Sequence, residues 1–118
     1  MTDRPSGASH DPHQDATNFL AAVGGDRLVR EMVALFVAYT PQRIAAMHVA
    51  SGRRDARGLQ REAFALRAAA MQLGLCEVER AAATIEREAG DPGVLLADLE
   101  HAYADAVRRL QPPAARVA

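Results

Sequence analysis

The sequence predicts an all-α fold: an antiparallel up-and-down four-helix bundle with a short extra helix at its N-terminus. Apolar residues recur at spacings of three and four along most of the chain, and no segment shows the alternation of a half-buried strand. Alanine, the strongest helix former, is abundant, whereas aromatic residues make up only 4% of the chain. The periodic segments are separated by short connections, which place successive helices antiparallel.

Length and charge restrict the class of protein. A chain of 118 residues suits one small domain, and a net charge of −1 provides no general attraction to nucleic acids or acidic membranes. The single cysteine, Cys76, excludes an internal disulfide and fits a reducing compartment. No segment approaches the roughly 18 apolar residues of a membrane span. We therefore expect a cytoplasmic protein without nucleic-acid or membrane partners.

Both ends of the chain are poor in residues that a core could bury. The segment 1–15 mixes Pro, Gly, Ser, His and Asp, so we expect it to be disordered. The segment 111–118 contains two adjacent prolines, which cannot continue a helix, and we expect a disordered tail there. The predicted four-helix bundle therefore occupies residues 16–110.

The first half of the bundle is predicted from breaks in the apolar pattern. A short helix ends at Gly24-Gly25, and a longer one begins near Asp26. Thr40-Pro41 is expected to interrupt it and to start a new segment, nearly collinear, that stops around Ser51-Gly52. Helical spacing predicts that these segments bury Leu28, Met32, Leu35, Phe36, Tyr39, Ile44 and Met47, with His48 as a further candidate.

Caps mark the remaining three helices. Asp55 is the predicted N-cap of the next helix, and Gly74 is its predicted C-terminal stop. A helix over Cys76–Ala89 follows and is expected to end at Gly90. Asp91-Pro92 combines an N-cap with a first-turn proline and begins the last helix, which runs to residue 110.

Phe64 lies outside the apolar seam of its helix. The seam is formed by Leu59, Ala63, Leu66, Ala70 and Leu73, and at 100° per residue Phe64 points about 160° away from Leu66. Its neighbours on that outward face are predicted to form a partner-binding surface, made of Gln60, Arg61, Phe64, Arg67, Ala68, Met71 and Gln72. The alternative is that the short helix near Phe19, or a loop, covers Phe64.

The same helix carries a family resemblance. The run AFALRAAAMQLG, residues 63–74, resembles the signature of histidine-containing phosphotransfer (HPt) domains, roughly A-H-x-L-K-G-S-A-x-x-L-G. The direct matches are Ala63, Leu66, Ala70, Leu73 and Gly74. Three positions differ in kind: Arg67 stands for a lysine, Ala68 for a glycine and Ala69 for a serine. The flanks resemble the family too, since a proline-interrupted helix and a Gly-x-x-Asp lead precede the motif.

The resemblance implies a fold and a partner, but the sequence departs from it at the reacting position. HPt domains are four-helix bundles in which an exposed histidine accepts a phosphoryl group from a receiver domain or kinase and passes it on. Phe64 occupies that position, and a phenyl ring has no lone pair that could attack phosphorus. We therefore expect no catalytic residue and no enzyme activity. The expected partner is a response-regulator receiver domain or a histidine kinase, and Arg67 could still neutralise phosphate charge.

Two alternatives remain open at this point. A relocated phosphoacceptor is one, with His48 as its candidate; the pair His10 and His13 is expected to lie in a solvated tail, and His101 to be solvated. The other is a homodimer formed through Phe64, although we expect a monomer. No cofactor or metal site is predicted, because no Glu-x-x-His pair is present and the pair His10 and His13 has no further ligands.

Two further features receive simple interpretations. The run of arginines at 53, 54, 57 and 61 is expected to be a solvated face or the rim of a docking site for an acidic protein, since the aromatic residues typical of nucleic-acid patches are missing between them. Cys76 is expected to be a packed structural thiol, because no histidine is evidently placed to activate it.

Overall fold

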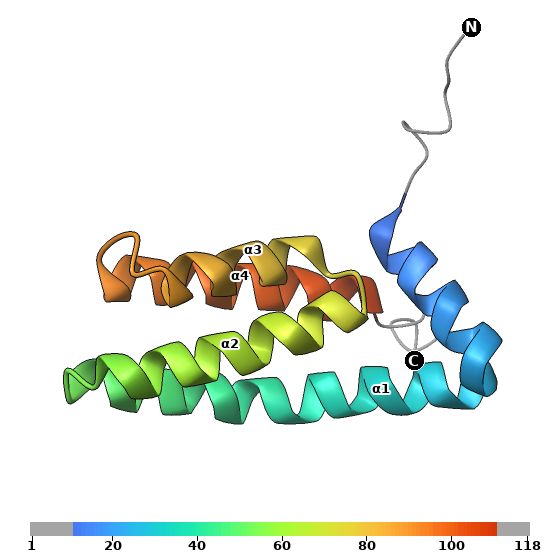
Figure 1. Cartoon of the computed structure of the whole chain (residues 1–118), viewed down its shortest axis with the longest axis horizontal. Coiled ribbons are helices and arrows are strands. Elements are labelled where there is room, and N and C mark those ends of the chain that lie inside the picture. Colours follow the sequence, from blue (N-terminus) through green and yellow to red (C-terminus); the bar gives the residue numbers. More distant parts are fainter. Residues whose placement is uncertain (1–10, 111–118) are drawn as a thin grey trace, which may run out of the picture.

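The computed structural model describes residues 11–110, and every regular element within this range is a helix. The elements are α1 (Pro12–Gly52), α2 (Ala56–Gln72), α3 (Cys76–Glu86) and α4 (Pro92–Leu110). Each helix packs against the next along the chain, and α4 also packs against α1, which closes the group (Figure 1). The predicted all-α class is confirmed. No helix in this range has the length and apolarity that crossing a membrane requires.

Helix α1 consists of two parts that meet at a sharp bend. Gly25 has φ 77° and ψ 179°, which is outside helical geometry and accessible to glycine at low cost. In Figure 1 the part before Gly25 stands steeply against the long part of α1. The predicted break at Gly24-Gly25 is therefore confirmed.

The start of α1 differs from the prediction. Asp11 caps the helix, with its carboxylate accepting from the backbone N–H groups of His13 at 3.0 Å and Gln14 at 3.4 Å. Pro12 then occupies the first turn, where its missing N–H is not needed. Disorder up to Asp15 is thus wrong for residues 12–15, because composition alone did not reveal this cap. Residues 1–10 and the predicted tail 111–118 lie outside the described range.

The predicted interruption at Thr40-Pro41 is also wrong. The backbone of α1 stays helical through Pro41, and non-helical angles within α1 occur at Gly25. Proline lacks the N–H that would bond to the carbonyl of Val37 one turn earlier. The hydroxyl of Tyr103 on α4 donates to that carbonyl instead, at 2.8 Å. A tertiary hydrogen bond therefore satisfies the acceptor that the proline leaves without its helical partner.

The other helix ends follow the predicted caps, with one exception. Asp55 accepts from the N–H of Gly58 at 2.9 Å, and Asp91 accepts from that of Val94 at 3.2 Å, as N-caps do. Gly74 ends α2 with φ 65°, and the N–H of the next residue donates to the carbonyl of residue 70 at 3.0 Å. Helix α3, however, ends at Glu86 and not at Ala89.

A non-glycine residue takes the left-handed position after α3. Glu88 has φ 55°, so it occupies the conformation that the sequence assigned to Gly90. The N–H of Glu88 donates to the carbonyl of Ile85 at 3.0 Å, and that of Ala89 donates to Thr84 at 3.2 Å. These hydrogen bonds satisfy the last turn of α3, and Gly90 becomes part of the loop to α4.

The core contains most of the predicted apolar residues together with several alanines. Its fully buried large side chains come from all four helices and the α2–α3 connection; they are Met47, Leu66, Leu73, Val78, Ile85, Leu96 and Leu99. Burial was predicted wrongly for Leu35 and Tyr39, each of which is 54% exposed, and Thr40 is buried instead. His48 is exposed and pairs with Glu100 of α4 at 3.2 Å. The apolar face of α1 is wider than the surface that α2 and α4 cover.

Candidate functional site

Phe64 lies on the outward face of α2, as helix geometry predicted. Its side chain is 54% exposed, whereas Ala63 and Leu66 on the opposite face are completely buried. Phe19, which was considered as a cover, is itself strongly exposed. The alternative in which the short N-terminal helix or a loop buries Phe64 is therefore wrong for the described residues. A large ring remains available on the surface.

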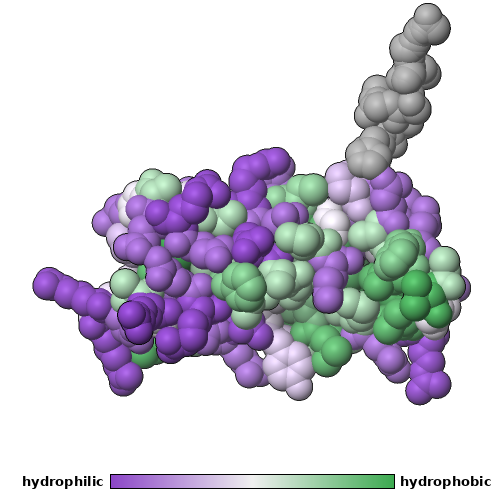
Figure 2. Space-filling model, in the orientation of Figure 1, coloured by the Kyte–Doolittle hydropathy of each residue, from purple (hydrophilic) through white to green (hydrophobic). Residues whose placement is uncertain are grey.

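Two further residues continue this exposed surface along α2. Ala68 follows Phe64 by one turn and is exposed, and Met71 follows by two turns and is 50% exposed. We call these three residues the Phe64 strip. On the face drawn in Figure 2 hydrophobic areas interrupt a largely hydrophilic surface, and the largest lies over the N-terminal part of α1 at the right-hand end. The strip is thus a modest apolar surface and not the most extensive one.

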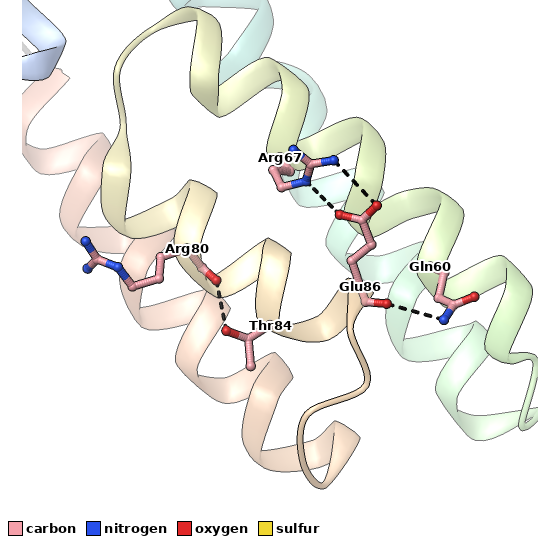
Figure 3. A network of polar contacts seen from close by, with 5 residues as sticks. All are labelled: Gln60, Arg67, Arg80, Thr84 and Glu86. Carbon is pink, nitrogen blue, oxygen red and sulfur yellow. Dashed lines mark hydrogen bonds and ion pairs between the residues drawn. The ribbon is translucent and has the colours of Figure 1, made fainter.

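Arg67 is held in place by a neighbour on α3. Its Nε donates to Oε1 of Glu86 at 2.6 Å, and its Nη2 donates to Oε2 at 3.5 Å (Figure 3). The hydrogen bond to Glu86 is the main cause that raises the pKa of Arg67 above the ordinary value of an arginine. The guanidinium also lies 5.2 Å from the ring centre of Phe64, within cation–π range. Arg67 therefore orients the Phe64 ring and is not a free cation for phosphate.

Gln60 ties α2 to the end of α3. Its Nε2 donates to the backbone carbonyl of Glu86 at 3.3 Å, as Figure 3 shows, and to the carboxylate of Glu88 at 2.5 Å. A second bond in the same view lies within α3, where the Thr84 hydroxyl donates to the carbonyl of Arg80 at 3.0 Å. Gln60 lies about one turn before Phe64 and Arg67 about one turn after it, so their bonds to Glu86 hold α2 against α3 on either side of Phe64 along the helix.

The remaining predicted residues form the rim of the strip. Arg61 and Gln72 are both exposed. Arg57, which the sequence prediction did not include in the site, joins Gln60, Arg61 and Phe64 in lining a shallow depression. Arg57 lies seven residues before Phe64, so two turns of helix place it on the same face, and this spacing could have identified it from the sequence. The seven predicted site residues therefore share one helix, but Gln60 and Arg67 already have partners.

The histidines do not gather at this surface. His13 is half-buried, and its Nδ1 lies 2.5 Å from the carbonyl of Leu73, so the expectation that it is solvated is wrong. His101 is exposed as predicted, and His10 lies outside the described residues. Within residues 11–110 no three His, Cys, Asp or Glu side chains form a group that could hold a metal ion. Cys76 is a half-buried free thiol.

These features define the class: a helical bundle-like protein with an exposed, arginine-supported phenylalanine on its second helix. Comparison with models of known families, with curated proteins and with solved structures found no match for the chain. The resemblance to HPt domains therefore rests on the sequence of residues 63–74 and their flanks alone.

Proposed function

We propose that this chain is an HPt-like binding module of two-component or phosphorelay signalling. It docks a response-regulator receiver domain or a histidine kinase in the cytoplasm and carries no phosphate itself. The observation that carries the proposal is the 54% exposure of Phe64 at the position where the HPt signature has its histidine. The reversal of chain direction from each helix to the next in Figure 1 supports an antiparallel, HPt-like bundle.

The Phe64 strip supplies the binding free energy in this proposal. Complete burial of a phenylalanine side chain contributes about 1.5–3 kcal/mol relative to full exposure, and the ring of Phe64 has roughly half of that still to gain. Met71 adds a flexible apolar side chain that adapts to different partners. Arg67 holds the ring in place before binding, which reduces the entropy lost when the partner docks.

The charges around the strip favour an acidic partner. Arg57 and Arg61 are exposed beside Phe64, and neither forms an ion pair with another residue in the range 11–110. The family resemblance implies a receiver domain, whose phosphorylation pocket is acidic, and opposite charges steer such an encounter. Arg67 contributes less to this attraction, since Glu86 already neutralises it.

Calorimetry with purified receiver domains from the same cell tests the proposal. We expect one receiver to bind the wild-type chain and to lose at least tenfold in affinity with Phe64→Asp, because the apolar ring is lost and the new carboxylate repels the acidic receiver. Val94→Asp is the matched control: Val94 is also exposed but lies at the start of α4, so this variant should bind normally. Equal binding by both variants would exclude the Phe64 strip as the docking surface.

The exposed apolar strip supports one other function, a homo-oligomerisation module. Two copies could bury Phe64 and Met71 against each other. Light scattering at high protein concentration separates the two functions, since the binding module stays monomeric and the oligomerisation module does not. Phosphotransfer through a different histidine has less support, because the exposed His48 faces Glu100 on α4 and not the α2 surface.

A further inference from the structure

A groove between α1 and α2 contains none of the three residues of the Phe64 strip, and Gln72 lies at the edge of both surfaces. Its cavity has a volume of about 210 Å³, and its walls are mainly apolar. Its lining side chains include Leu35, Phe36, Tyr39, Thr40, Leu66 and Leu73. Phe36, Leu66 and Leu73 are buried and form the floor, whereas Leu35 and Tyr39 are 54% exposed and form one edge. The groove therefore combines a buried apolar floor with an open side.

Thr40 is one of the residues that line this groove. The residue is only 3% exposed, yet its hydroxyl makes no hydrogen bond with any residue of the described chain. The other two threonines within residues 11–110 behave differently, since Thr17 and Thr84 donate to carbonyls of their own helices at 3.1 and 3.0 Å. A buried polar group without a partner is rare and destabilising. A molecule that supplies the missing hydrogen bond would remove this cost.

The charges at the groove favour a neutral molecule. Among the lining residues only Arg43 is charged, and its Nη1 already donates to Glu62 at 3.1 Å. Gln72 adds a neutral amide at the edge. A charged ligand would therefore find no uncompensated opposite charge among the lining side chains, and it would lose hydration on entering an apolar groove.

We propose that this groove binds a small neutral aromatic molecule of the phenol class. A cavity of roughly 150 Å³ lined by apolar side chains is sufficient for benzene, so the groove has space for one ring and a substituent. The ring packs on Phe36, Leu66 and Leu73, and the phenolic oxygen pairs with the Thr40 hydroxyl, which can donate or accept. Leu35 and Tyr39 cover the ring from the open side.

A comparison of p-cresol with toluene tests this site. The two molecules differ by one hydroxyl, and their affinities are measured by NMR titration of the full chain. We expect p-cresol to bind the wild type and to lose roughly three- to tenfold in affinity with Thr40→Val, which keeps the shape and removes the hydroxyl. Toluene should bind weakly and should not lose affinity with this variant. Equal losses for the two molecules, or none for p-cresol, would overturn the proposal.

Two further variants control the experiment. Thr84→Val removes a hydroxyl that lies outside the groove, so it should leave p-cresol binding unchanged. Leu35→Ala shortens an exposed edge residue without disturbing the core, so it should weaken the binding of both molecules. This variant still tests the groove if Thr40→Val fails to fold. Phe64→Asp should leave p-cresol binding unchanged, so the outcome of this experiment does not depend on the proposed docking function. Absence of p-cresol-induced shifts at groove residues of the wild type would also exclude the site.

Discussion

The hydroxyl of Tyr103 on α4 donates a 2.8 Å hydrogen bond to the backbone carbonyl of Val37 on α1. This carbonyl would normally accept from residue 41, where Pro41 has no N–H. The ring of Tyr103 also packs against Phe36, with ring centres 5.9 Å apart. One side chain on α4 therefore both satisfies α1 at its proline and joins the two helices.

Removal of this hydroxyl should be costly only while the proline is present. Tyr103→Phe leaves the Val37 carbonyl without its donor, and we expect a loss of about 1–2 kcal/mol in the free energy of unfolding. In a Pro41→Ala background the helix supplies its own N–H, so the same substitution should cost clearly less. Denaturant unfolding of the four proteins in this double-mutant cycle measures the difference. Equal losses in both backgrounds would show that Tyr103 does not compensate for Pro41.

Alkaline pH should weaken the fold through the same residue. Burial raises the pKa of Tyr103 above 10.0, so the folded state keeps the proton at a pH where the unfolded state releases it. The protonated phenol of Tyr103 therefore contributes to the free energy of unfolding. This contribution is fully present below about pH 10 and is lost as pH rises through the higher pKa of the folded state. The chain contains no lysine to titrate in the same range.

Unfolding measured from pH 8 to 11.5 checks this dependence. The free energy of unfolding should decline with rising pH, and this decline should be smaller in Tyr103→Phe, which has no phenol at this position. Tyr39→Phe should retain it, because Tyr39 is exposed. A decline of the same size in Tyr103→Phe and the wild type would assign the effect to other groups.

Gly74 should be much less replaceable than Gly52. Gly74 has φ 65°, and an added Cβ would lie 2.1 Å from the carbonyl oxygen of Pro12. Gly74→Ala should therefore cost about 2 kcal/mol or more through backbone strain and the clash. Gly52→Ala meets no atom within 4 Å at the end of a helix, so its effect should be near zero or slightly stabilising.

The contact at Gly74 also has a local consequence. Pro12 and His13 are close to residues 73 and 74, so the clash should loosen the N-terminal part of α1 from the bundle. Hydrogen exchange in residues 14–24 should increase in Gly74→Ala before global unfolding does. Unchanged protection of this segment would show that it is held by other contacts.

Phe64→His should give the proposed docking surface a phosphoryl acceptor. A ring nitrogen of the new histidine would attack phosphorus in a phosphorylated receiver, and the aspartyl carboxylate would leave. We expect weak acid-labile labelling, because Arg67 is already paired with Glu86 and is therefore less able to neutralise the phosphate charge. Adding Glu86→Gln should free Arg67 and increase the labelling. A folded Phe64→His that binds the receiver and stays unlabelled would show that the position alone does not support transfer.

The sequence alone determined the features that depend on local backbone chemistry. Asp55 and Asp91 were predicted as caps because a short acidic side chain reaches the free N–H groups of the following turn, and the structure has both bonds. Gly74 was predicted as a stop because a left-handed residue is needed there. The outward direction of Phe64 followed from the fixed angle per residue of a helix.

Only the tertiary structure decided which surfaces are covered and which polar groups are paired. Tyr103 reaches Val37 across 66 residues of sequence, and no local pattern announces that Pro41 will be tolerated inside α1. Leu35 and Tyr39 fit the apolar face of α1 but remain exposed, because α2 and α4 cover a narrower surface than the periodicity implies. The pairing of Arg67 with Glu86 likewise depends on where α3 packs. Helix geometry sets directions along one helix, whereas the position of its neighbours sets burial.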